Sequence, residues 1–237
     1  MSNVELLKFD SPEKLAERVA ADWIETIRAA ARAGRRQTVA LSGGRIAKTF
    51  FEATTRLAYA EAMSFRNVDF FWADERCVPA TSADSNYKLA KDHLLDPLAL
   101  NPVHVHPLCS GEDGRSSSVQ AAEKLKRVAA INGSGMPEID LIFLGMGEDG
   151  HVASLFPEEN EPTRNLPDIY RPVIATKPPP QRITIGYNEI AAAQEVWVLA
   201  SGAGKETALA ESLKPDGRTP LARVLQNRAR TRIYSDV

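Results

Sequence analysis

Short, almost wholly apolar segments that alternate with helical segments are the feature that most restricts the fold of this chain. They occur at residues 37–41 (QTVAL), 68–73 (VDFFWA), 140–144 (DLIFL) and 195–200 (EVWVLA). Strands that are apolar on both faces are typical of parallel sheets that helices cover on each side. The sequence therefore predicts an α/β fold with a mainly parallel sheet between two layers of helices.

Helices are expected between these strands. Ser11-Pro12-Glu13 combines a capping serine, a first-turn proline and an acidic residue, and an apolar stripe then runs with helical period as far as Gly34. The other helices that the pattern predicts begin after residues 44 and 85, or cover residues 116–131, 205–213 and 220–226. Further short strands are expected at residues 103–108, 171–176, 182–187 and 231–235, with the second and third joined as a hairpin. Because no repeat, long linker or low-complexity tract interrupts residues 1–237, we expect a single domain.

Composition limits the possible partners. The net charge is −2 and the isoelectric point about 6.1, so there is no general electrostatic reason to expect nucleic acid or an anionic membrane as a partner. No apolar run approaches the roughly 20 residues that span a bilayer. Cys77 and Cys109 lack metal-site spacing, and the first residues lack the apolar core of a signal peptide. A cytoplasmic protein is therefore expected, and any anionic ligand must be held by a local cluster of cations.

A glycine-rich motif follows the predicted strand 140–144. Residues 145–150 (GMGEDG) match the G-x-G-x-x-G of dinucleotide-binding loops. Such a loop needs a long helix after its third glycine, whereas Pro157 comes only seven residues later. The acid that would bind a ribose should end the next strand, but Asp168 precedes that strand. An NAD site is therefore not expected.

Two other glycine-rich loops also end predicted strands. Ser42-Gly43-Gly44-Arg45 offers uncrowded backbone amides and a guanidinium group, a combination that suits a phosphate. Ser201-Gly-Ala-Gly-Lys205 resembles a nucleotide P-loop, but its first glycine is missing and Glu206 replaces the hydroxyl residue that would bind Mg²⁺. Each loop alone could be an ordinary tight turn between a strand and a helix. Together they favour an anion site.

Asp149-Gly150-His151 is the potentially reactive part of the third loop. An imidazole in a glycine-rich loop at a strand end can act as a base near neutral pH, and an acid two residues earlier could orient the ring. The alternative is a histidine that caps a short helix. The other three histidines, His93, His104 and His106, lack ligand spacing and are expected to be structural. There is no G-x-S-x-G elbow, and no histidine lies near Cys77 in the sequence.

Taken in order, these segments resemble the 6-phosphogluconolactonase family, within the group that includes the glucosamine-6-phosphate deaminases. The resemblance is carried by residues 41–44 (LSGG), 70–79 (FFWADERCVP) with Ser85-Asn86, 144–157 (LGMGEDGHVASLFP), 182–184 (RIT) and 201–205 (SGAGK). Asp74-Glu75-Arg76 and the sequence ASLFP after the histidine are similar to lactonases, because deaminases carry a DEY motif and an Asn-Glu pair. One departure is Ile46-Ala47, since family members often have a hydroxyl residue after the two glycines.

The resemblance implies a Rossmann-like three-layer α/β/α fold, similar to that of glucosamine-6-phosphate deaminase, and hydrolysis of 6-phospho-D-glucono-1,5-lactone without metal, nucleotide or other cofactor. It implies that His151 is the general base, that Asp149 positions His151 or sugar hydroxyls, and that the backbone amides of the loop Gly147–Gly150 stabilise the oxyanion. The residues expected to surround the substrate are Ser42, Gly43, Gly44, Arg45, Asp74, Arg76, Asn86, Arg182 and Lys205.

Several alternatives stay open at this point. Asp74 is expected to hold Arg76 in place, Arg182 could instead be a charge on the strand surface, and the cation that binds the phosphate is not assigned. The chain could also be a sugar-phosphate isomerase or deaminase, or a sugar-phosphate-binding protein without catalysis. Both a monomer and a homodimer are compatible with the sequence.

Overall fold

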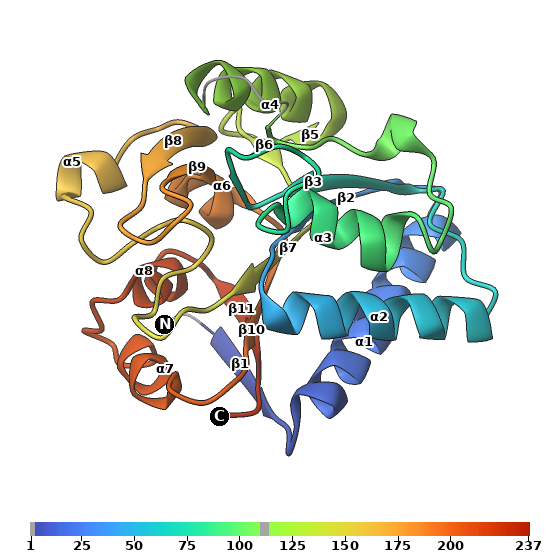
Figure 1. The fold of residues 1–237 in the computed structure, drawn as a ribbon, viewed down its shortest axis with the longest axis horizontal. Coiled ribbons are helices and arrows are strands. Elements are labelled where there is room, and N and C mark those ends of the chain that lie inside the picture. Colours follow the sequence, from blue (N-terminus) through green and yellow to red (C-terminus); the bar gives the residue numbers. More distant parts are fainter. Residues whose placement is uncertain (1–2, 110–113) are drawn as a thin grey trace.

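A six-stranded parallel sheet forms the centre of the molecule, in the order β1–β11–β10–β7–β2–β3 (Figure 1). The computed structural model describes residues 3–109 and 114–237. The strands of this sheet are β1 (Asn3–Lys8), β2 (Gln37–Leu41), β3 (Val68–Trp72), β7 (Leu141–Gly145), β10 (Glu195–Ala200) and β11 (Arg230–Ser235). The predicted parallel sheet is confirmed. The edge strand β1 was not predicted from the sequence.

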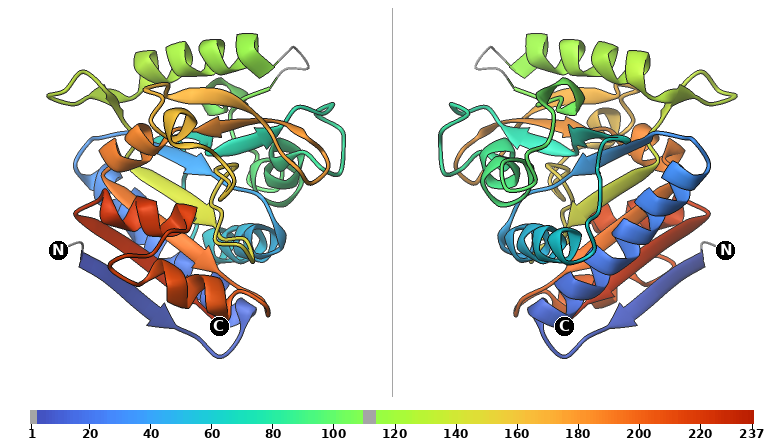
Figure 2. Two further views of the ribbon diagram at one scale, coloured as in Figure 1. Left: turned by 90° about the vertical axis from the view of Figure 1, so that its left-hand side faces the viewer. Right: turned by 90° about the vertical axis from the view of Figure 1, so that its right-hand side faces the viewer.

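Helices cover both faces of this sheet, which confirms the three-layer prediction. One face carries α1 (Pro12–Arg32) and α2 (Arg45–Ala60), and the other carries α7 (Glu206–Ser212) and α8 (Pro220–Gln226) (Figure 2). Ser11 caps α1 as predicted, because its hydroxyl accepts a hydrogen bond from the Lys14 amide. Two shorter helical elements are α6 (Tyr187–Ala192) and α3 (Asn86–Ala90), and α3 continues as a π-helical turn over Lys91–Leu95 beside α2.

Aromatic side chains hold the α1–α2 layer on the sheet. The fully buried Trp23 of α1 lies 5.5 Å from the ring centre of Phe50 on α2 and 5.2 Å from that of Phe143 on β7. Burial of one such side chain stabilises the fold by about 1.5–3 kcal/mol, to which edge-to-face ring contacts add. The start of α2 is therefore fixed firmly beside the ends of β2 and β7.

A second, antiparallel sheet lies above the ends of the central strands. It has the order β4 (Asp74–Arg76), β9 (Gln181–Ile185), β8 (Tyr170–Ile174), and α4 (Gly114–Val128) packs against it. The β8–β9 pair confirms the predicted hairpin. The short strand β4 was not predicted from the sequence. It begins two residues after β3 ends, so it brings Asp74 and Arg76 directly above the central sheet.

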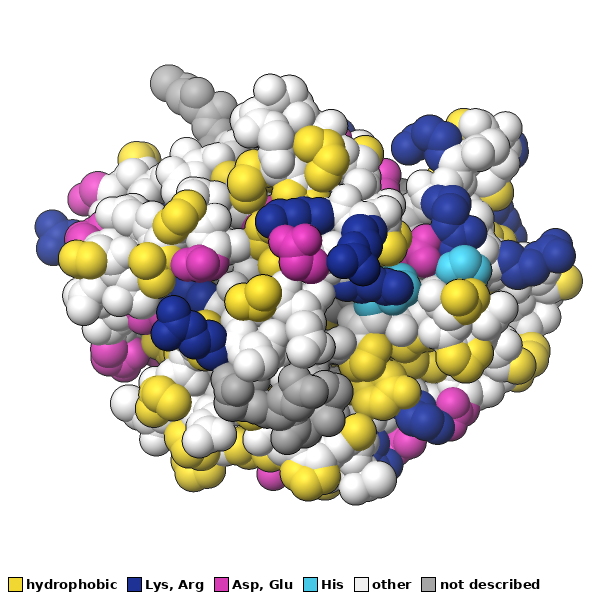
Figure 3. All heavy atoms as spheres, turned by 90° about the horizontal axis from the view of Figure 1, so that it is seen from above, with side chains coloured by type: hydrophobic (Ala, Val, Ile, Leu, Met, Phe, Trp, Pro, Cys, Tyr) yellow, Lys and Arg dark blue, Asp and Glu magenta, His cyan; other side chains and the backbone are white. Residues whose placement is uncertain are grey.

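Two predicted elements are wrong in part. Residues 103–108 form no strand of a sheet: Pro102–His104 is a 3₁₀ turn, and Val105 makes only a single bridge to Phe70. Both His104 and His106 turn instead toward the carboxylate of Asp69. In Figure 3, which views the molecule from above, lysine and arginine side chains gather beside histidines. The contacts of His104 and His106 with Asp69 support the expectation that both histidines are structural.

The helix predicted for residues 116–131 also ends early. It stops at Val128, and β5 (Ala130–Ile131) then pairs with β6 (Pro137–Glu138). A further short helix, α5 (Glu161–Arg164), lies in the connection to β8. Among the residues that the structure describes, no helix is both long enough and apolar enough to cross a membrane.

Candidate active site

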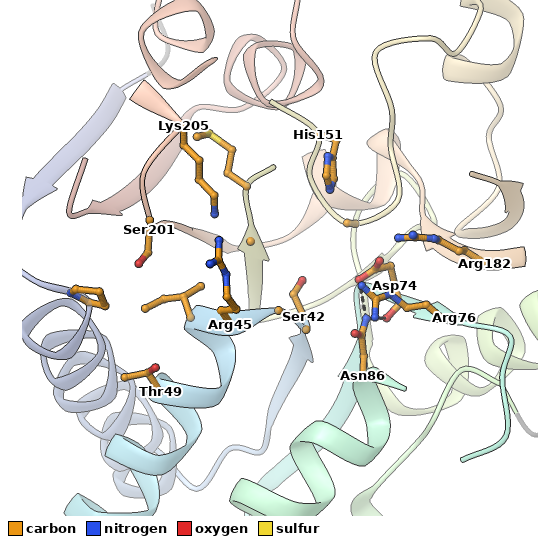
Figure 4. A pocket seen from close by; sticks show the side chains of 18 of the residues that line it. Ser42, Arg45, Thr49, Asp74, Arg76, Asn86, His151, Arg182, Ser201 and Lys205 are labelled. Carbon is orange, nitrogen blue, oxygen red and sulfur yellow. Dashed lines mark hydrogen bonds between the residues drawn. The ribbon is translucent and has the colours of Figure 1, made fainter. Parts of the chain in front are cut away.

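The loops that follow β2, β3, β7 and β10 meet around a pocket of about 350 Å³. This position is expected, because ligands of open parallel sheets bind beyond the carboxyl ends of the strands. The pocket is lined by most of the residues predicted from the sequence (Figure 4), namely Ser42, Gly43, Gly44, Arg45, Asp74, Arg76, Asn86, His151, Arg182 and Lys205. The structure therefore brings together residues that are up to 163 positions apart in the chain.

One end of the pocket is formed by Arg45 and Lys205. Arg45 is the first residue of α2, Lys205 directly precedes α7, and their side chains point toward each other (Figure 4). Burial lowers the pKa of the Lys205 amine, and the charge of Arg45 lowers it further. Two cations that disfavour each other's charge gain stability when an anion binds between them. The N-terminus of the 16-residue helix α2 adds free amides and a favourable dipole at the same place.

The other end contains Arg76 and Arg182, which face each other across the β4–β9 ladder. Arg182 donates hydrogen bonds from Nε to the carbonyl of Pro179, at 3.0 Å, and from Nη2 to that of Lys177, at 3.2 Å. Burial lowers the pKa of Arg182, and Arg76 lowers it further. Arg182 is therefore a buried member of the pocket, not a charge on the strand surface.

Asp74 does not hold Arg76, which corrects one expectation. Arg76 donates from Nη1 to the backbone carbonyl of Asp84, at 2.7 Å. The carboxylate of Asp74 instead accepts from Asn86 Nδ2 at 3.1 Å and from Ser154 Oγ at 2.7 Å. Asn86 also donates to the Asp74 carbonyl at 2.9 Å. Both carboxylate oxygens of Asp74 are thus bonded within the protein.

Gly43 has a packing role that explains its identity. A Cβ atom at this position would lie 1.9 Å from Asn86 Oδ1 and 2.5 Å from Asn86 Cγ. Real atoms do not approach so closely, so only glycine lets the first loop pass over the Asn86 amide. Gly43, Asn86 and Asp74 therefore fix the floor of the pocket as one unit.

His151 and Asp149 form a hydrogen-bonded pair. His151 Nδ1 lies 2.5 Å from Asp149 Oδ1, which also accepts from the His151 amide at 3.1 Å. Because an ionised carboxylate only accepts hydrogen bonds, Nδ1 carries the proton and the Nε2 lone pair remains available. Burial raises the pKa of Asp149, but the hydrogen bonds and charge of His151 outweigh it and leave this pKa below its usual value.

Phe156 lies close to both His151 and one of the arginines of the pocket. Its ring centre lies 5.1 Å from that of His151, and the guanidinium carbon of Arg182 lies 5.6 Å from the same ring centre. His151 and Arg182 thus share one aromatic neighbour. The base predicted from the sequence belongs to the Arg76–Arg182 end of the pocket.

Gly147 and Gly150 do not line the pocket. The amide of Gly147 donates to the His151 carbonyl at 2.9 Å, and that of Gly150 donates to the Gly147 carbonyl at 3.1 Å. A Cβ on Gly147 would lie 2.1 Å from the His151 ring, and Gly150 has a φ of +78°. These glycines shape the loop and give the histidine room. Their amides are already used, so the predicted oxyanion role is not open to them.

Sequence reasoning missed several residues of the site. The pocket is also lined by Pro12, Glu13, Ile46, Thr49, Met146 and Ala153, and by Ser201 and Gly202 of the glycine-rich loop that was expected to bind an anion. Thr49 lies one helical turn after Arg45, a spacing that could have revealed it. Thr49 provides a hydroxyl group in the first part of α2, where Ile46-Ala47 stand in place of the hydroxyl residue expected from the family. Ser154 and Phe156 belong to the ASLFP motif that carries the family resemblance, but no role in the site was predicted for either of them.

Comparison with known proteins gives a consistent result. The family model described as glucosamine-6-phosphate isomerases/6-phosphogluconolactonase matches residues 10–233. A probable chloroplastic 6-phosphogluconolactonase 3 of Oryza sativa is 36% identical over 210 residues, which are 86% of this chain and 64% of that protein. The 6-phosphogluconolactonase of Streptomyces coelicolor is 34% identical over 230 residues, covering 92% and 87% of the two chains. The solved 6-phosphogluconolactonase of Trypanosoma brucei superposes with a TM-score of 0.85 at 25% identity, covering 99% of this chain and 97% of that one.

Proposed function

Because this chain belongs to the glucosamine-6-phosphate isomerase/6-phosphogluconolactonase family, we propose that it hydrolyses 6-phospho-D-glucono-1,5-lactone to 6-phospho-D-gluconate, a step of the oxidative pentose phosphate pathway. One observation carries the proposal. The pocket has a pair of cations at each end, and the histidine of a histidine–aspartate pair shares the aromatic neighbour Phe156 with Arg182. This arrangement suits a substrate with a phosphate at one end and a reactive carbonyl at the other.

The phosphate is assigned to Arg45 and Lys205. This end combines two cations, glycine amides and the N-terminus of α2, the features that bind phosphate in many proteins. Phe156, the shared neighbour of His151 and Arg182, belongs to the other end. A phosphate held here directs the lactone ring toward the histidine.

The reacting carbonyl C1 then lies near His151, Arg76 and Arg182. His151 Nε2 takes a proton from water as the water oxygen attacks C1, and the carbonyl oxygen becomes an oxyanion that the two arginines stabilise. The tetrahedral intermediate collapses by breaking the bond between C1 and the ring oxygen. His151 returns the proton to that oxygen, which becomes the hydroxyl of the open-chain product. Asp149 keeps the imidazole oriented and stabilises its protonated form.

The hydrogen bonds of Asp74 are relevant to the alternative activity, that of a sugar-phosphate isomerase or deaminase. An isomerase or deaminase moves a proton between C1 and C2 and needs a carboxylate that is free to do so. Asp74 lies in the pocket, but both its oxygens accept hydrogen bonds from Asn86 and Ser154. This disfavours a proton-transfer role for Asp74.

A coupled assay tests the proposal. Glucose-6-phosphate dehydrogenase generates the lactone, and its disappearance is followed with and without this chain. We expect disappearance well above the spontaneous rate, and no ammonia from glucosamine 6-phosphate. Thermal stabilisation by 6-phosphogluconate without any acceleration would instead indicate a binding protein that lacks catalysis. The cytoplasmic location and the choice between monomer and homodimer stay predictions.

A further inference from the structure

The loop that carries His151 is tied to the second sheet through Ser154. Ser154 is fully buried, three residues beyond the histidine. Its hydroxyl donates to Asp74 Oδ2 at 2.7 Å, and its amide donates to Thr184 Oγ1 at 3.1 Å. Asp74 belongs to β4 and Thr184 to β9, so one residue bonds to both strands.

The register of these strands gives the contact its significance. Asp74 pairs with Thr184 across the β4–β9 ladder, and Arg76 pairs with Arg182 two residues further along. Ser154 therefore forms hydrogen bonds to the pair Asp74–Thr184. The next pair on the same side of the strands consists of the two arginines. Side chains two residues apart on a strand point to the same face. The hydrogen bonds of Ser154 thus fix the His151 loop relative to the strands that carry Arg76 and Arg182.

The backbone beside Ser154 has an unusual conformation. Ala153, which lines the pocket between His151 and Ser154, has a φ of +50°. Residues other than glycine rarely adopt this conformation, and it persists only where surrounding contacts fix it. Val152 supplies further contacts through backbone bridges to Met146 and Leu155. The loop is held in one strained shape, and the hydrogen bonds of Ser154 are part of what holds it.

We propose that Ser154 is a positioning residue, which uses Asp74 and Thr184 to fix His151 at the place where the base and the two arginines act on the same carbonyl. The role rests on the hydrolysis proposed above and goes beyond it, because Ser154 does not line the pocket. Asp74 then serves mainly as the acceptor that joins this loop to Asn86 and the first glycine loop. A shift of the base by about 1 Å can cost on the order of 100-fold in rate.

Replacement of Ser154 by alanine tests this role. Ser118→Ala is the matched control, because Ser118 is also buried and its hydroxyl donates to a backbone carbonyl in α4, away from the pocket. We expect Ser154→Ala to lower kcat about 10- to 100-fold with KM changed less than about threefold, since the phosphate end is untouched. Ser118→Ala should keep wild-type kcat even if its melting temperature falls equally. Unchanged kcat in folded Ser154→Ala would overturn the proposal.

A spectroscopic readout separates positioning from the reaction itself. The imidazole signals of His151, assigned by their loss in His151→Ala, are followed by NMR through a pH titration. We expect Ser154→Ala to shift these signals and the pH midpoint of kcat/KM, and Ser118→Ala to leave both unchanged. If the wild-type chain did not hydrolyse the lactone, the proposed function would fail, while the NMR comparison would still decide whether Ser154 positions His151.

A second pair of variants covers the case in which Ser154→Ala does not fold. Thr184→Val keeps the shape of the side chain but removes the acceptor of the Ser154 amide, and Thr184→Ser keeps the hydroxyl. We expect Thr184→Val to lower kcat and shift the His151 signals, and Thr184→Ser to restore both. Equal kcat and equal His151 spectra in the two variants would contradict the proposal.

Discussion

Gly43→Ala should damage both stability and activity, through a clash that can be worked out from the structure. The added Cβ would lie 1.9 Å from Asn86 Oδ1, so the Asn86 side chain must move by more than 1 Å to reach ordinary contact distance. Asn86 is 2% exposed and donates two hydrogen bonds to Asp74, so it cannot move without losing them. Two lost bonds cost about 1 kcal/mol each. Overpacking adds about 1–3 kcal/mol, which makes the total destabilisation roughly 4 kcal/mol.

Urea denaturation measures this cost, and two other glycines provide controls. An alanine Cβ at Gly133 or Gly44 would meet no atom within 4 Å, but Gly44 has a φ of +99°. Gly133→Ala should therefore be nearly neutral. Gly44→Ala should lose roughly 1–3 kcal/mol, because a φ of +99° with a ψ of 174° is a conformation almost exclusive to glycine. If Gly43→Ala unfolded at the same urea concentration as Gly133→Ala, the packing role of Gly43 would be refuted. The kcat/KM of Gly43→Ala should also fall, because Asp74 and Asn86 would shift together.

Three further predictions concern charges. Asp149→Asn should lower kcat about 10- to 100-fold in steady-state kinetics, because the neutral amide stabilises the protonated imidazole of His151 less; the loss is smaller than for a fully buried aspartate. Arg45→Ala and Lys205→Ala should each raise KM about tenfold or more with little change in kcat, because a hydrogen bond to a charged group contributes about 1.5–3 kcal/mol; unchanged KM in both would contradict the phosphate assignment. Burial raises the pKa of Glu189 from 4.5 to about 8, so the folded state favours the protonated form, and the resulting stability is complete below pH 4.5 and lost as pH rises through about 8. Glu189→Gln should remove this fall and be more stable at pH 8 by on the order of 4 kcal/mol, which urea denaturation at pH 5 and pH 8 can check.

Features set by local sequence could be predicted. The buried strands β2, β3, β7 and β10 and the capped helix α1 follow from hydrophobic patterns and capping residues within a few positions. The glycine loops were expected at strand ends, and the parallel sheet places those ends together. The pairing of His151 with Asp149 is also local, because they are only two positions apart in the sequence.

Features set by contacts between distant segments could not be predicted. Ser154 and Asp74 are 80 residues apart, and Asn86 and Gly43 meet only because two loops cross. The short strand β4 exists because the hairpin partner β9 is present, and β1 because β11 offers a free edge. Residues 103–108 have strand-like alternation, but His104 and His106 form hydrogen bonds with the buried Asp69 instead. In each case a tertiary partner outweighs the local pattern.

Hydrolysis by His151→Ala is the most direct test of the central claim, that this histidine is the base of a lactone hydrolase. The lactone is generated with glucose-6-phosphate dehydrogenase, and kcat/KM for its disappearance is compared between the wild-type chain and the variant. Thermal stabilisation by 6-phosphogluconate confirms that the variant folds and binds. We predict that kcat/KM falls about 10²- to 10⁴-fold in His151→Ala, the usual contribution of general base catalysis. A folded variant with near-wild-type kcat/KM would contradict the account.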